Sequence, residues 1–409
     1  MQTIMSHLPT SSNENSEISH GDLQSASVSS IKSLPRVPTL STRHDHQSDD
    51  SGTQNYCIAT LTGHTSYIFS LTLAGKFLYT GSSDSEIRAW KRNPHSYEDG
   101  DANLANNVVA LTKGAVKSLV VLANKLFSAH QDCKIRVWKM KTQEPYKNQK
   151  CEKIATLPTL GDRTVKLINP TNQVQIRRHK KCTWVHHVDA VSALALSRNE
   201  SLLYSVSWDR TLKIWQTCDF KCLESVTNAH DDAINALAVS DIGDIYTGSA
   251  DKRIKVWRKL PGDKKHSLVS TLEKHNSGIN ALALSPDGSL LYSGAGDRSI
   301  LVWEKNDEDD NMKLLGALRG HAKAVLCLAA IGDLVFSGSA DKTIRVWRGV
   351  EGRYSCLAVL EGHHGPIKCL AAAVDPYGKH GRNVLSCNGG RRKDSSATYK
   401  VENVAHEFA

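Results

Sequence analysis

Hydrophobic and polar residues follow one another along this chain in a repeating order. Each unit starts with a short apolar run, such as AINALAVS (233–240), which predicts an inner strand buried on both faces. A second run, such as LLYSVS (202–207), leads into a tight turn that contains Asp. β-Branched residues then alternate with Lys or Arg up to a Trp, as in TLKIW (211–215), which is typical of half-exposed strands. Each unit therefore predicts strands joined by hairpins.

The second half of each unit follows one template. An aromatic residue precedes Ser or Thr, Asp stands four residues after that Ser or Thr, and Trp stands six residues after the Asp. The six copies are YTGSSDSEIRAW (79–90), FSAHQDCKIRVW (127–138), YSVSWDRTLKIW (204–215), YTGSADKRIKVW (246–257), YSGAGDRSILVW (292–303) and FSGSADKTIRVW (336–347). These copies define an internal repeat.

The spacing of the template Trp residues indicates propeller blades. Consecutive Trp residues are 48, 77, 42, 46 and 44 positions apart, close to the period of about 40–45 residues typical of four-stranded blades. The interval of 77 crosses residues 141–181, where nothing matches the template. We interpret this segment as an insertion after the second unit.

A His stands at a fixed offset before most inner strands, seven residues ahead of a Leu. These residues are His64, His187, His230, His275, His321 and His363. If Thr112 replaces His before Leu119, the chain holds seven units. On this pattern the chain resembles the WD40 repeat family over about residues 56–374, which implies an all-β, seven-bladed WD40 β-propeller.

The resemblance implies a role for the repeated polar residues. In WD40 blades the His, the Ser or Thr, the Asp and the Trp form a hydrogen-bonded tetrad. The expected tetrads are His64/Thr80/Asp84/Trp90, His187/Ser205/Asp209/Trp215, His230/Thr247/Asp251/Trp257, His275/Ser293/Asp297/Trp303 and His321/Ser337/Asp341/Trp347. The second unit has Ser128, Asp132 and Trp138 but no His at the usual offset.

The two ends depart from the repeat. We expect residues 1–55, rich in polar residues, to form a disordered tail, within which SLPRVPTL (33–40) is either an extended docking segment or a linker. The atypical last blade, 363–409, lacks the template Asp and Trp. We expect the ring to close because CIATL (57–61) joins that blade, with NVLSC and ATYKV as its middle strands and with lower stability than the other blades.

Composition and charge narrow the function classes. The chain has 409 residues, of which 40% are hydrophobic and 23% charged, and no apolar run approaches the roughly 18 residues of a membrane span. The N-terminus lacks the pattern of a secretory signal, and the ten Cys lack paired CxxC spacing, so we expect an intracellular product with reduced thiols, in cytoplasm or nucleus. Residues 139–181 carry eleven Lys or Arg and three acids, a net +8 within a total of +9.

Three patterns superficially suggest catalysis or ligand chemistry. His, Ser and Asp recur together five times, whereas a nucleophilic site needs a single strained, exposed constellation. The Gly-rich strings lack the P-loop spacing, and NDEDDN (306–311) lacks the Gly and terminal Glu of an EF-hand. We therefore expect no enzymatic activity, cofactor or metal.

The resemblance also implies where partners bind. WD40 rim contacts occur one, three and five residues after the His and just before the turn Asp. Carried over, the rim consists of Tyr67, Phe69, Lys117, Gln131, Ser192, Trp208, Asn235, Asn280, Leu326 and Lys368, with Ser83, His364 and Pro366 at further rim positions. We expect the aromatic residues to form a ledge beside the two lysines that fits an acidic, hydrophobic peptide, although local packing of Trp208 is the alternative.

The basic segment contains a cluster formed by Arg177, Arg178, Lys180 and Lys181. It is interpreted either as a solvated loop or as a signal for nuclear import or for contact with nucleic acid or acidic lipid. Nucleic-acid binding is the less favoured function, because no aromatic residues interleave the cluster.

Within the WD40 family, the chain resembles the plant Jingubang-like proteins. The resemblance rests on ATLTGHTSYIFSL, KFLYTGSSDSEIRAW, the basic insertion before HVDAVSALALS, and GHHGPIKCLAAA. It implies a plant regulatory scaffold, a monomeric propeller acting through partner proteins that include transcription factors. The alternatives are a substrate receptor of a ubiquitin ligase, and binding of nucleic acid or acidic lipid through the insertion.

Overall fold

Seven sheets, each with four antiparallel strands, and one two-stranded hairpin make up most of the part of the chain that the computed structural model describes. Six sheets have four strands, and one has a fifth strand added at its edge. The described residues are 38–42, 56–91, 107–141, 150–167, 173–177, 180–306, 311–350, 352–374, 381–388 and 398–405. The predicted seven-bladed all-β fold is therefore confirmed.

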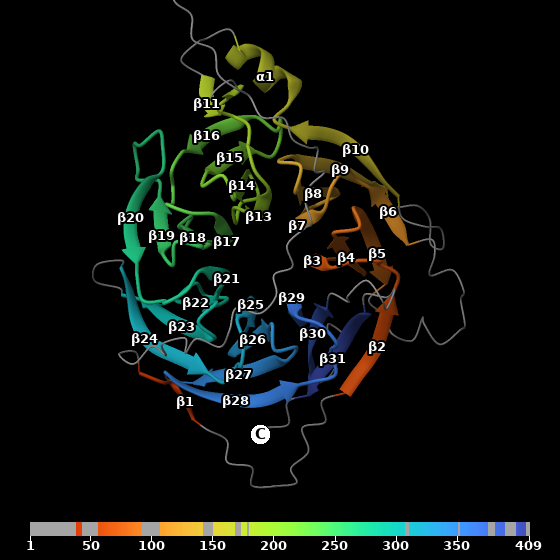
Figure 1. Cartoon of the computed structure of the whole chain (residues 1–409), viewed down its shortest axis with the longest axis vertical. Helices are drawn as coiled ribbons and strands as arrows, with labels where there is room; N and C mark the ends of the chain where they lie inside the picture. The colour runs from red at the N-terminus through yellow and green to blue at the C-terminus, as the bar shows by residue number, and fades with distance from the viewer. Residues whose placement is uncertain are drawn as a thin grey trace, which may run out of the picture. The chain divides into compact units, whose positions relative to one another are not determined.

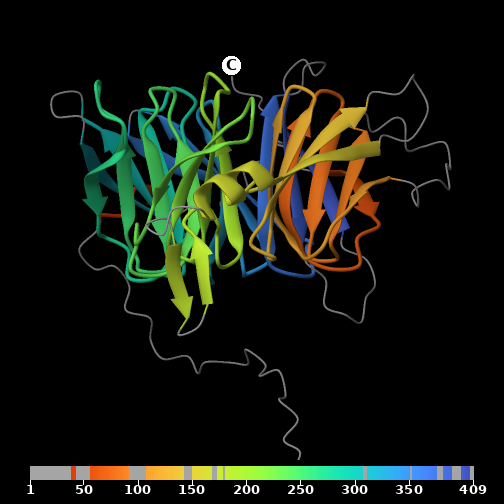
Figure 2. The same ribbon diagram turned by 90° about the horizontal axis from the view of Figure 1, so that it is seen from above.

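The sheets are arranged as blades around a ring (Figure 1). The inner strand of each blade contacts the inner strand of the next, and that of blade 7 contacts that of blade 1. Seen from the side in Figure 2, the strands run roughly between the two faces of the ring.

Each of blades 1 to 6 consists of four strands that follow one another in the chain, and the first of them lies nearest the centre of the ring. Blades 1 to 3 consist of β3 (Ile68–Ala74), β4 (Phe77–Ser82), β5 (Glu86–Lys91) and β6 (Val108–Leu111); β7 (Val116–Leu122), β8 (Lys125–His130), β9 (Ile135–Lys141) and β10 (Lys150–Leu157); and β13 (Val191–Leu196), β14 (Leu202–Ser207), β15 (Leu212–Gln216) and β16 (Cys222–Val226). Blades 4 to 6 consist of β17 (Ile234–Val239), β18 (Ile245–Ser249), β19 (Ile254–Arg258) and β20 (Ser267–Leu272); β21 (Ile279–Leu284), β22 (Leu290–Ala295), β23 (Ser299–Lys305) and β24 (Met312–Arg319); and β25 (Val325–Ile331), β26 (Leu334–Ser339), β27 (Ile344–Val350) and β28 (Arg353–Leu360).

Blade 7 joins the two ends of the propeller. Counted outward from the centre, its first three strands are β29 (Ile367–Val374), β30 (Gly381–Asn388) and β31 (Thr398–Ala405). The outermost strand is β2 (Tyr56–Thr62), which pairs antiparallel with β31. The predicted closing strand and both predicted middle strands are therefore confirmed. Closure in this way gives the last blade its fourth strand from the start of the repeat region.

Burial within a blade differs from the prediction made for the inner strand. In β17 only Ile234 and Ala236 are fully buried and the rest are half-buried, because β17 is the innermost strand of its blade and its free edge faces the centre of the ring (Figure 1). The second strand is the one that is buried throughout, as in β18 and β26. The third strand is also more buried than its alternation indicates, since Lys213 is 1% exposed and its ammonium group donates to the Trp184 carbonyl and the Ser225 hydroxyl, both at 2.6 Å.

The basic insertion is shorter than predicted. Residues 150–157 form β10, the outer strand of blade 2, so the predicted start at residue 141 was wrong. The remainder contains α1 (Leu160–Leu167) and the antiparallel pair β11 (Gln173–Arg177) and β12 (Lys180–Thr183). Asp162 in α1 accepts a hydrogen bond from the Cys222 amide at 3.3 Å, which attaches the helix to the outer strand of blade 3.

A short segment ahead of the repeats is also ordered. Thr39 forms a parallel bridge with Ala317 of β24, and β1 (Ser41–Thr42) pairs in parallel with β28. The predicted disordered tail therefore does not include residues 38–42, and of its two interpretations for 33–40 docking holds for Pro38 to Leu40. The rest of residues 1–55 lies outside the described part.

Candidate functional site: the tetrads and the rim

The repeated polar residues are joined by hydrogen bonds in five blades. The His Nδ1 lies 2.7–3.3 Å from an Asp Oδ2, the His Nε2 lies 2.8–2.9 Å from the Ser or Thr hydroxyl, and the Trp Nε1 donates to that hydroxyl at 2.8–3.1 Å. Because an ionised Asp only accepts, the His carries its hydrogen on Nδ1. The blades with this arrangement are the five with complete expected tetrads.

The hydroxyl and indole members of these tetrads lie inside the blades, each at most 6% exposed. The buried hydroxyl members are Thr80, Ser205, Thr247, Ser293 and Ser337, and the buried indole members are Trp90, Trp215, Trp257, Trp303 and Trp347. In each blade the indole and the His Nε2 both reach the same hydroxyl, which leaves these polar atoms paired within the protein. Since a partner cannot reach buried side chains, these ten residues do not belong to a binding surface and support the blades instead.

The tetrads hold the Asp in its ionised form. Burial alone would raise the pKa of Asp297, but hydrogen bonds from His275, Ser299 and the Asn276 amide outweigh it and lower the pKa to about 2. The pKa of Asp251 is likewise lowered to about 2, against the effect of burial, chiefly by His230. The same contacts use both oxygens of each carboxylate, so the tetrads link the rim turn to the interior of the blade.

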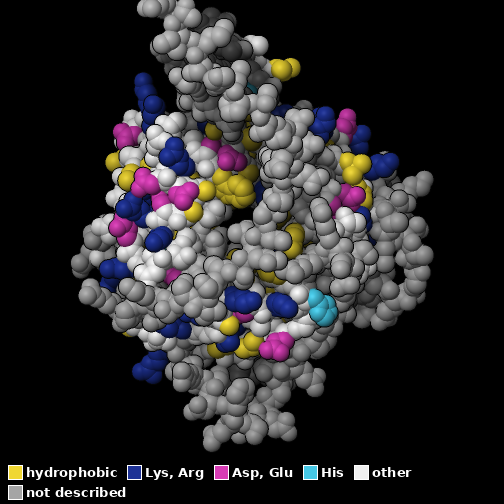
Figure 3. All heavy atoms as spheres, viewed as in Figure 1, with side chains coloured by type: hydrophobic (Ala, Val, Ile, Leu, Met, Phe, Trp, Pro, Cys, Tyr) yellow, Lys and Arg dark blue, Asp and Glu magenta, His cyan; other side chains and the backbone are white. Residues whose placement is uncertain are grey.

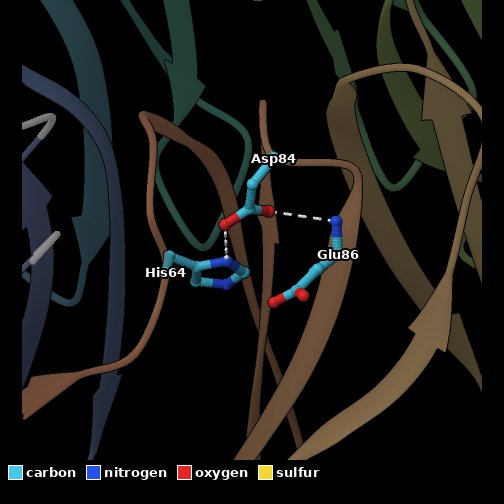
Figure 4. A group of neighbouring side chains, drawn as sticks. All are labelled: His64, Asp84 and Glu86. Carbon is cyan, nitrogen blue, oxygen red and sulfur yellow. Dashed lines mark hydrogen bonds and ion pairs between the residues drawn. The ribbon is translucent and has the colours of Figure 1, made fainter. Parts of the chain in front are cut away.

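The tetrad of blade 1 resembles a metal site because Glu86 lies beside His64 and Asp84 (Figure 4). His64 bonds Asp84 through Nδ1 at 2.7 Å and Thr80 through Nε2 at 2.9 Å. The Glu86 carboxylate pairs with Arg88 at 2.7 Å. Since both ring nitrogens and the second carboxylate are engaged within the protein, the group acts as a structural network.

Blade 2 replaces its missing His from an unexpected position. Thr112 does not take over the role expected of it, because its hydroxyl donates to backbone carbonyls, including that of Ser85 at 2.8 Å. Instead His130, at the end of β8, lies with Nε2 at 2.7 Å from the Ser128 hydroxyl, which also accepts from Trp138 at 2.7 Å. Asp132 pairs with Arg136 instead of with a His.

The sequence contains a signal for this replacement. The other five template copies have Ser or Ala at the position of His130, and the Ser hydroxyls donate to a carbonyl two residues after the blade's His position. His130 approaches the corresponding carbonyl, that of Gly114, at 3.4 Å through Nδ1. One side chain therefore substitutes for both a Ser and a His.

We predict that His130 makes stability depend on pH. Burial, followed by the charge of Arg136, lowers its pKa to about 3, whereas an unfolded His titrates near about 6.5. As the pH falls through this window the unfolded chain gains a proton that the native chain does not, so stability decreases by up to about 1.4 kcal/mol per pH unit. The free energy of unfolding of His130→Ser, measured with urea at several pH values, should change less steeply with pH, by the equivalent of about one proton. An unchanged slope would contradict the assignment, and His364→Ser, at an exposed position, is the control.

Backbone hydrogen bonds place the rim residues at one end of each blade. In six blades the amide of the residue before the turn Asp, or of its equivalent, donates to the carbonyl of the residue three after the His position. These pairs are Ser83 and Tyr67, Gln131 and Ala115, Trp208 and Ala190, Ala250 and Ala233, Gly296 and Gly278, and Ala340 and Ala324, at 2.7–3.0 Å. The two expected rim positions joined by each bond are therefore neighbours in these six blades.

Five of the predicted rim residues meet across four blades, and we call them the aromatic–lysine ledge: Tyr67, Phe69, Lys117, Trp208 and Lys368. The Lys117 ammonium nitrogen lies 3.9 Å from the centre of the Phe69 ring and 5.2 Å from that of Trp208. The Lys368 nitrogen lies 4.4 Å from the Tyr67 ring centre and 5.1 Å from that of Phe69. These separations are within the range of cation–π attraction.

The two lysines of the ledge lie close enough to repel each other. Burial, followed by repulsion from Lys368, lowers the pKa of Lys117, and no carboxylate among the described residues forms an ion pair with Lys117. Trp208 remains 39% exposed. On the face of the ring seen in Figure 3, hydrophobic, Lys or Arg, and Asp or Glu side chains are interspersed around the centre.

Other predicted rim residues hold the ring together. Ser192, Asn235 and Asn280 donate to carbonyls of the next blade's inner strand, namely those of Ile234, Ile279 and Val325, at 2.5–3.0 Å. These bonds give the three side chains a structural role. Leu326 is half-buried and Gln131 is exposed on the rim.

The basic cluster lies at the tip of a hairpin. Arg177 ends β11, and Lys180 and Lys181 begin β12, with Arg177 paired with Lys180 in the sheet. Arg178 lies outside the described residues. The binding role of the cluster stays a prediction. In the described part of the chain, no helix has the length and hydrophobicity to cross a membrane.

Seven four-stranded blades with repeated tetrads define a WD-type propeller, and comparison with known proteins gives the same class. The family described as "WD40: WD domain, G-beta repeat" matches residues 55–91, 179–216, 220–258, 266–304, 312–348 and 354–396. The chain belongs to the WD40 repeat family. The matches leave out blade 2, the blade with the altered tetrad.

Individual relatives match only part of the chain. It is 34% identical over 104 residues to the small ribosomal subunit protein RACK1 of Drosophila melanogaster, covering 25% of this chain and 31% of RACK1. It is 22% identical over 217 residues to the ribosome biogenesis protein YTM1 of Candida albicans, covering 51% of this chain and 46% of YTM1. The chain therefore spans less than half the length of either protein.

The fold has a solved counterpart. The WD40 β-propeller domain of Doa1 superposes with a TM-score of 0.61 at 19% identity, covering 85% of this chain and 97% of that domain. At this identity the similarity shows a common fold.

Proposed function

We propose that this protein is a non-enzymatic scaffold that binds acidic, hydrophobic segments of partner proteins on the aromatic–lysine ledge. The observation that carries the proposal is the approach of Lys117 to both Phe69 and Trp208, side chains that come from three different blades. Nothing in the tetrad hydrogen bonds requires an aromatic residue at position 208, because Ala, Gly, Ser or Gln occupies that position in the other template copies.

The chemistry of the ledge indicates the kind of ligand. Aromatic rings that are partly exposed supply contact area at low entropic cost, and Trp and Tyr are frequent hot spots of protein interfaces. A carboxylate placed near Lys117 and Lys368 would offset the repulsion between the two ammonium groups. Apolar side chains of the same segment would cover Phe69 and Trp208.

The proposal extends to a regulatory role. The resemblance to plant Jingubang-like proteins supports a plant developmental or transcription-linked regulator in the cytoplasm or nucleus, with transcription factors among its partners. RACK1 and YTM1, the relatives compared above, carry names that refer to the ribosome and its biogenesis. A substrate receptor of a ubiquitin ligase is the alternative, and it predicts co-purification of ligase adaptors.

The test uses the double variant Phe69→Ala/Trp208→Ala in the full chain. Partners recovered by affinity purification are identified by mass spectrometry, and binding to an array of peptides that combine Asp or Glu with Leu, Phe or Trp is measured in parallel. We expect the variant to lose at least about 30-fold in affinity, equivalent to about 2 kcal/mol for hot-spot residues. In Lys117→Gln/Lys368→Gln the remaining binding should become nearly independent of salt.

Leu326→Ala provides the matched control. Leu326 stands five residues after the His of blade 6, as Phe69 does in blade 1. It is half-buried, but it has no part in the ledge. This variant should bind like the wild type. If the Phe69/Trp208 variant folds normally, as judged by circular dichroism, and keeps every partner and peptide, the ledge is not the binding surface.

A further inference from the structure

The segment Pro38 to Thr42 crosses from one blade to the next. On blade 5, the Leu40 amide donates to the Ala317 carbonyl at 2.9 Å, and the Ala317 amide donates to the Pro38 carbonyl at 2.8 Å. On blade 6, Ser41 and Thr42 pair in parallel with Tyr354 and Ser355. In Figure 1, β1 lies beside β24 and β28 at the outer edge of the ring. The segment thus uses the free edges of two outer strands.

Blade 5 has a special feature at this place. Gly316 pairs with the residue before the blade's Trp, and a Cβ there would lie 2.6 Å from Leu40 Cγ and 2.8 Å from the Pro38 carbonyl oxygen. The equivalent outer-strand positions in blades 2, 3, 4 and 6 are Ala155, Glu224, Ser270 and Ala358. Among these five blades, blade 5 alone has no side chain at the position where the segment docks.

The side chain of Leu40 lies against Gly316, and the space that it fills between blades 5 and 6 is called the crevice. Leu40 packs against the buried cluster between blades 5 and 6 that includes Tyr292, Trp347 and Tyr354. The hydroxyl groups of Tyr292 and Tyr354 lie 3.2 Å apart within this cluster. The neighbouring Thr39 is exposed, and its hydroxyl accepts a hydrogen bond from Arg319 at 2.9 Å. One apolar anchor is therefore surrounded by main-chain contacts.

We propose that this crevice is a second peptide-binding site, in which residues 38–42 are a built-in occupant that competes with an extended segment of a partner protein. The partner segment has an apolar anchor such as Leu two residues after Pro. In strand addition the protein recognises the main chain of the ligand, and the crevice over Gly316 recognises one side chain. The site therefore does not require the protein's own sequence.

The geometry makes the occupant displaceable. Its described contacts consist of a few main-chain hydrogen bonds, one half-buried Leu and the Thr39–Arg319 bond. Its advantage over a free peptide is that residues 43–55 join it covalently to β2, and a tether of this kind raises the local concentration to about a millimolar. A partner with a longer or better-anchored segment can therefore replace it.

The experiment measures binding of a fluorescent peptide of residues 34–44, LPRVPTLSTRH, to the full chain. In Leu40→Asp, a charge placed against the apolar cluster releases the internal segment, so the peptide should bind at least tenfold more tightly than to the wild type. Adding Gly316→Val to this variant should abolish binding, because the new side chain fills the pocket. Ser270→Val, at the matching position of blade 4, is the control and should leave peptide binding to Leu40→Asp unchanged.

Three results would overturn the proposal. The first is that Leu40→Asp and Leu40→Ser both fold but do not bind the peptide at about a millimolar. This is the concentration that the tether provides. The second is equal binding by wild type and Leu40→Asp, which would mean that the internal segment does not occupy the crevice. The third is a wild-type dimer that Leu40→Asp converts to a monomer, which would place the segment of a second copy there. Because none of these variants alters the ledge, the outcome is independent of the function proposed above.

Discussion

Replacing Trp347 by alanine is expected to lower the free energy of unfolding by about 3–5 kcal/mol. Trp347 is fully buried between blades 5 and 6, and its Nε1 donates to the Ser337 hydroxyl at 2.8 Å. Truncation leaves a cavity in the cluster and removes the donor from that hydroxyl's set of partners, which also includes His321 Nε2 and the Arg345 carbonyl. Urea denaturation at pH 7, followed by tryptophan fluorescence and circular dichroism, measures the effect.

Two further variants separate the causes. Trp347→Phe keeps most of the buried volume but removes the hydrogen bond, and it should cost about 1–2 kcal/mol. Trp208→Ala removes a Trp that is 39% exposed on the rim, and it should cost less than about 1 kcal/mol. If Trp208→Ala destabilised the chain as strongly as Trp347→Ala, the ring at position 208 would serve packing instead of binding.

Acid is expected to unfold the propeller cooperatively between about pH 4 and pH 2. Burial alone would raise the pKa of each tetrad Asp, but hydrogen bonds, chiefly from the tetrad His, lower it in all five complete tetrads. A group with a lowered native pKa stabilises the fold above its unfolded pKa of about 3.9 and loses that contribution as the pH falls through the native value. Each such group adds up to about 1.4 kcal/mol per pH unit to the slope.

Asp297→Asn tests this explanation, because asparagine keeps the shape but cannot take up the proton. The variant should be less stable at pH 7. Between pH 4 and pH 2 its free energy of unfolding should fall less steeply than that of the wild type, by the equivalent of about one bound proton. Asp263→Asn, at an exposed loop position, is the control. An equal reduction of the slope in both variants would show that the tetrads do not cause the acid sensitivity.

The repeat made most of the fold predictable. The six template copies and the His offsets identify the blades, because each blade must satisfy the same polar contacts with residues close in sequence. The seventh blade was also predictable although it lacks the template Asp and Trp, since CIATL and the two C-terminal strands complete a four-stranded sheet. The template failed at His130, because a side chain from inside the strand reaches the Ser128 hydroxyl from a different position.

The limits of the insertion and of the tail depended on contacts with distant strands. Residues 150–157 follow no template, yet they are the outer strand of blade 2 because the edge of β9 is available for pairing. Residues 38–42 lie in a polar tail, yet they dock where Gly316 leaves room for Leu40. In both cases the deciding partner lies outside the segment itself.

By itself, the sequence determined the blades, the five complete tetrads and the row of residues that face the rim, because these follow from spacing within about 40 residues. Only the tertiary structure decided which rim residues meet. The curvature of the ring brings Lys368 of blade 7 beside Tyr67 of blade 1 and Lys117 of blade 2 beside Trp208 of blade 3. It also directs Ser192, Asn235 and Asn280 to the carbonyls of the next blade instead of to a partner. Distances between blades depend on packing of the whole ring, and no local pattern encodes them.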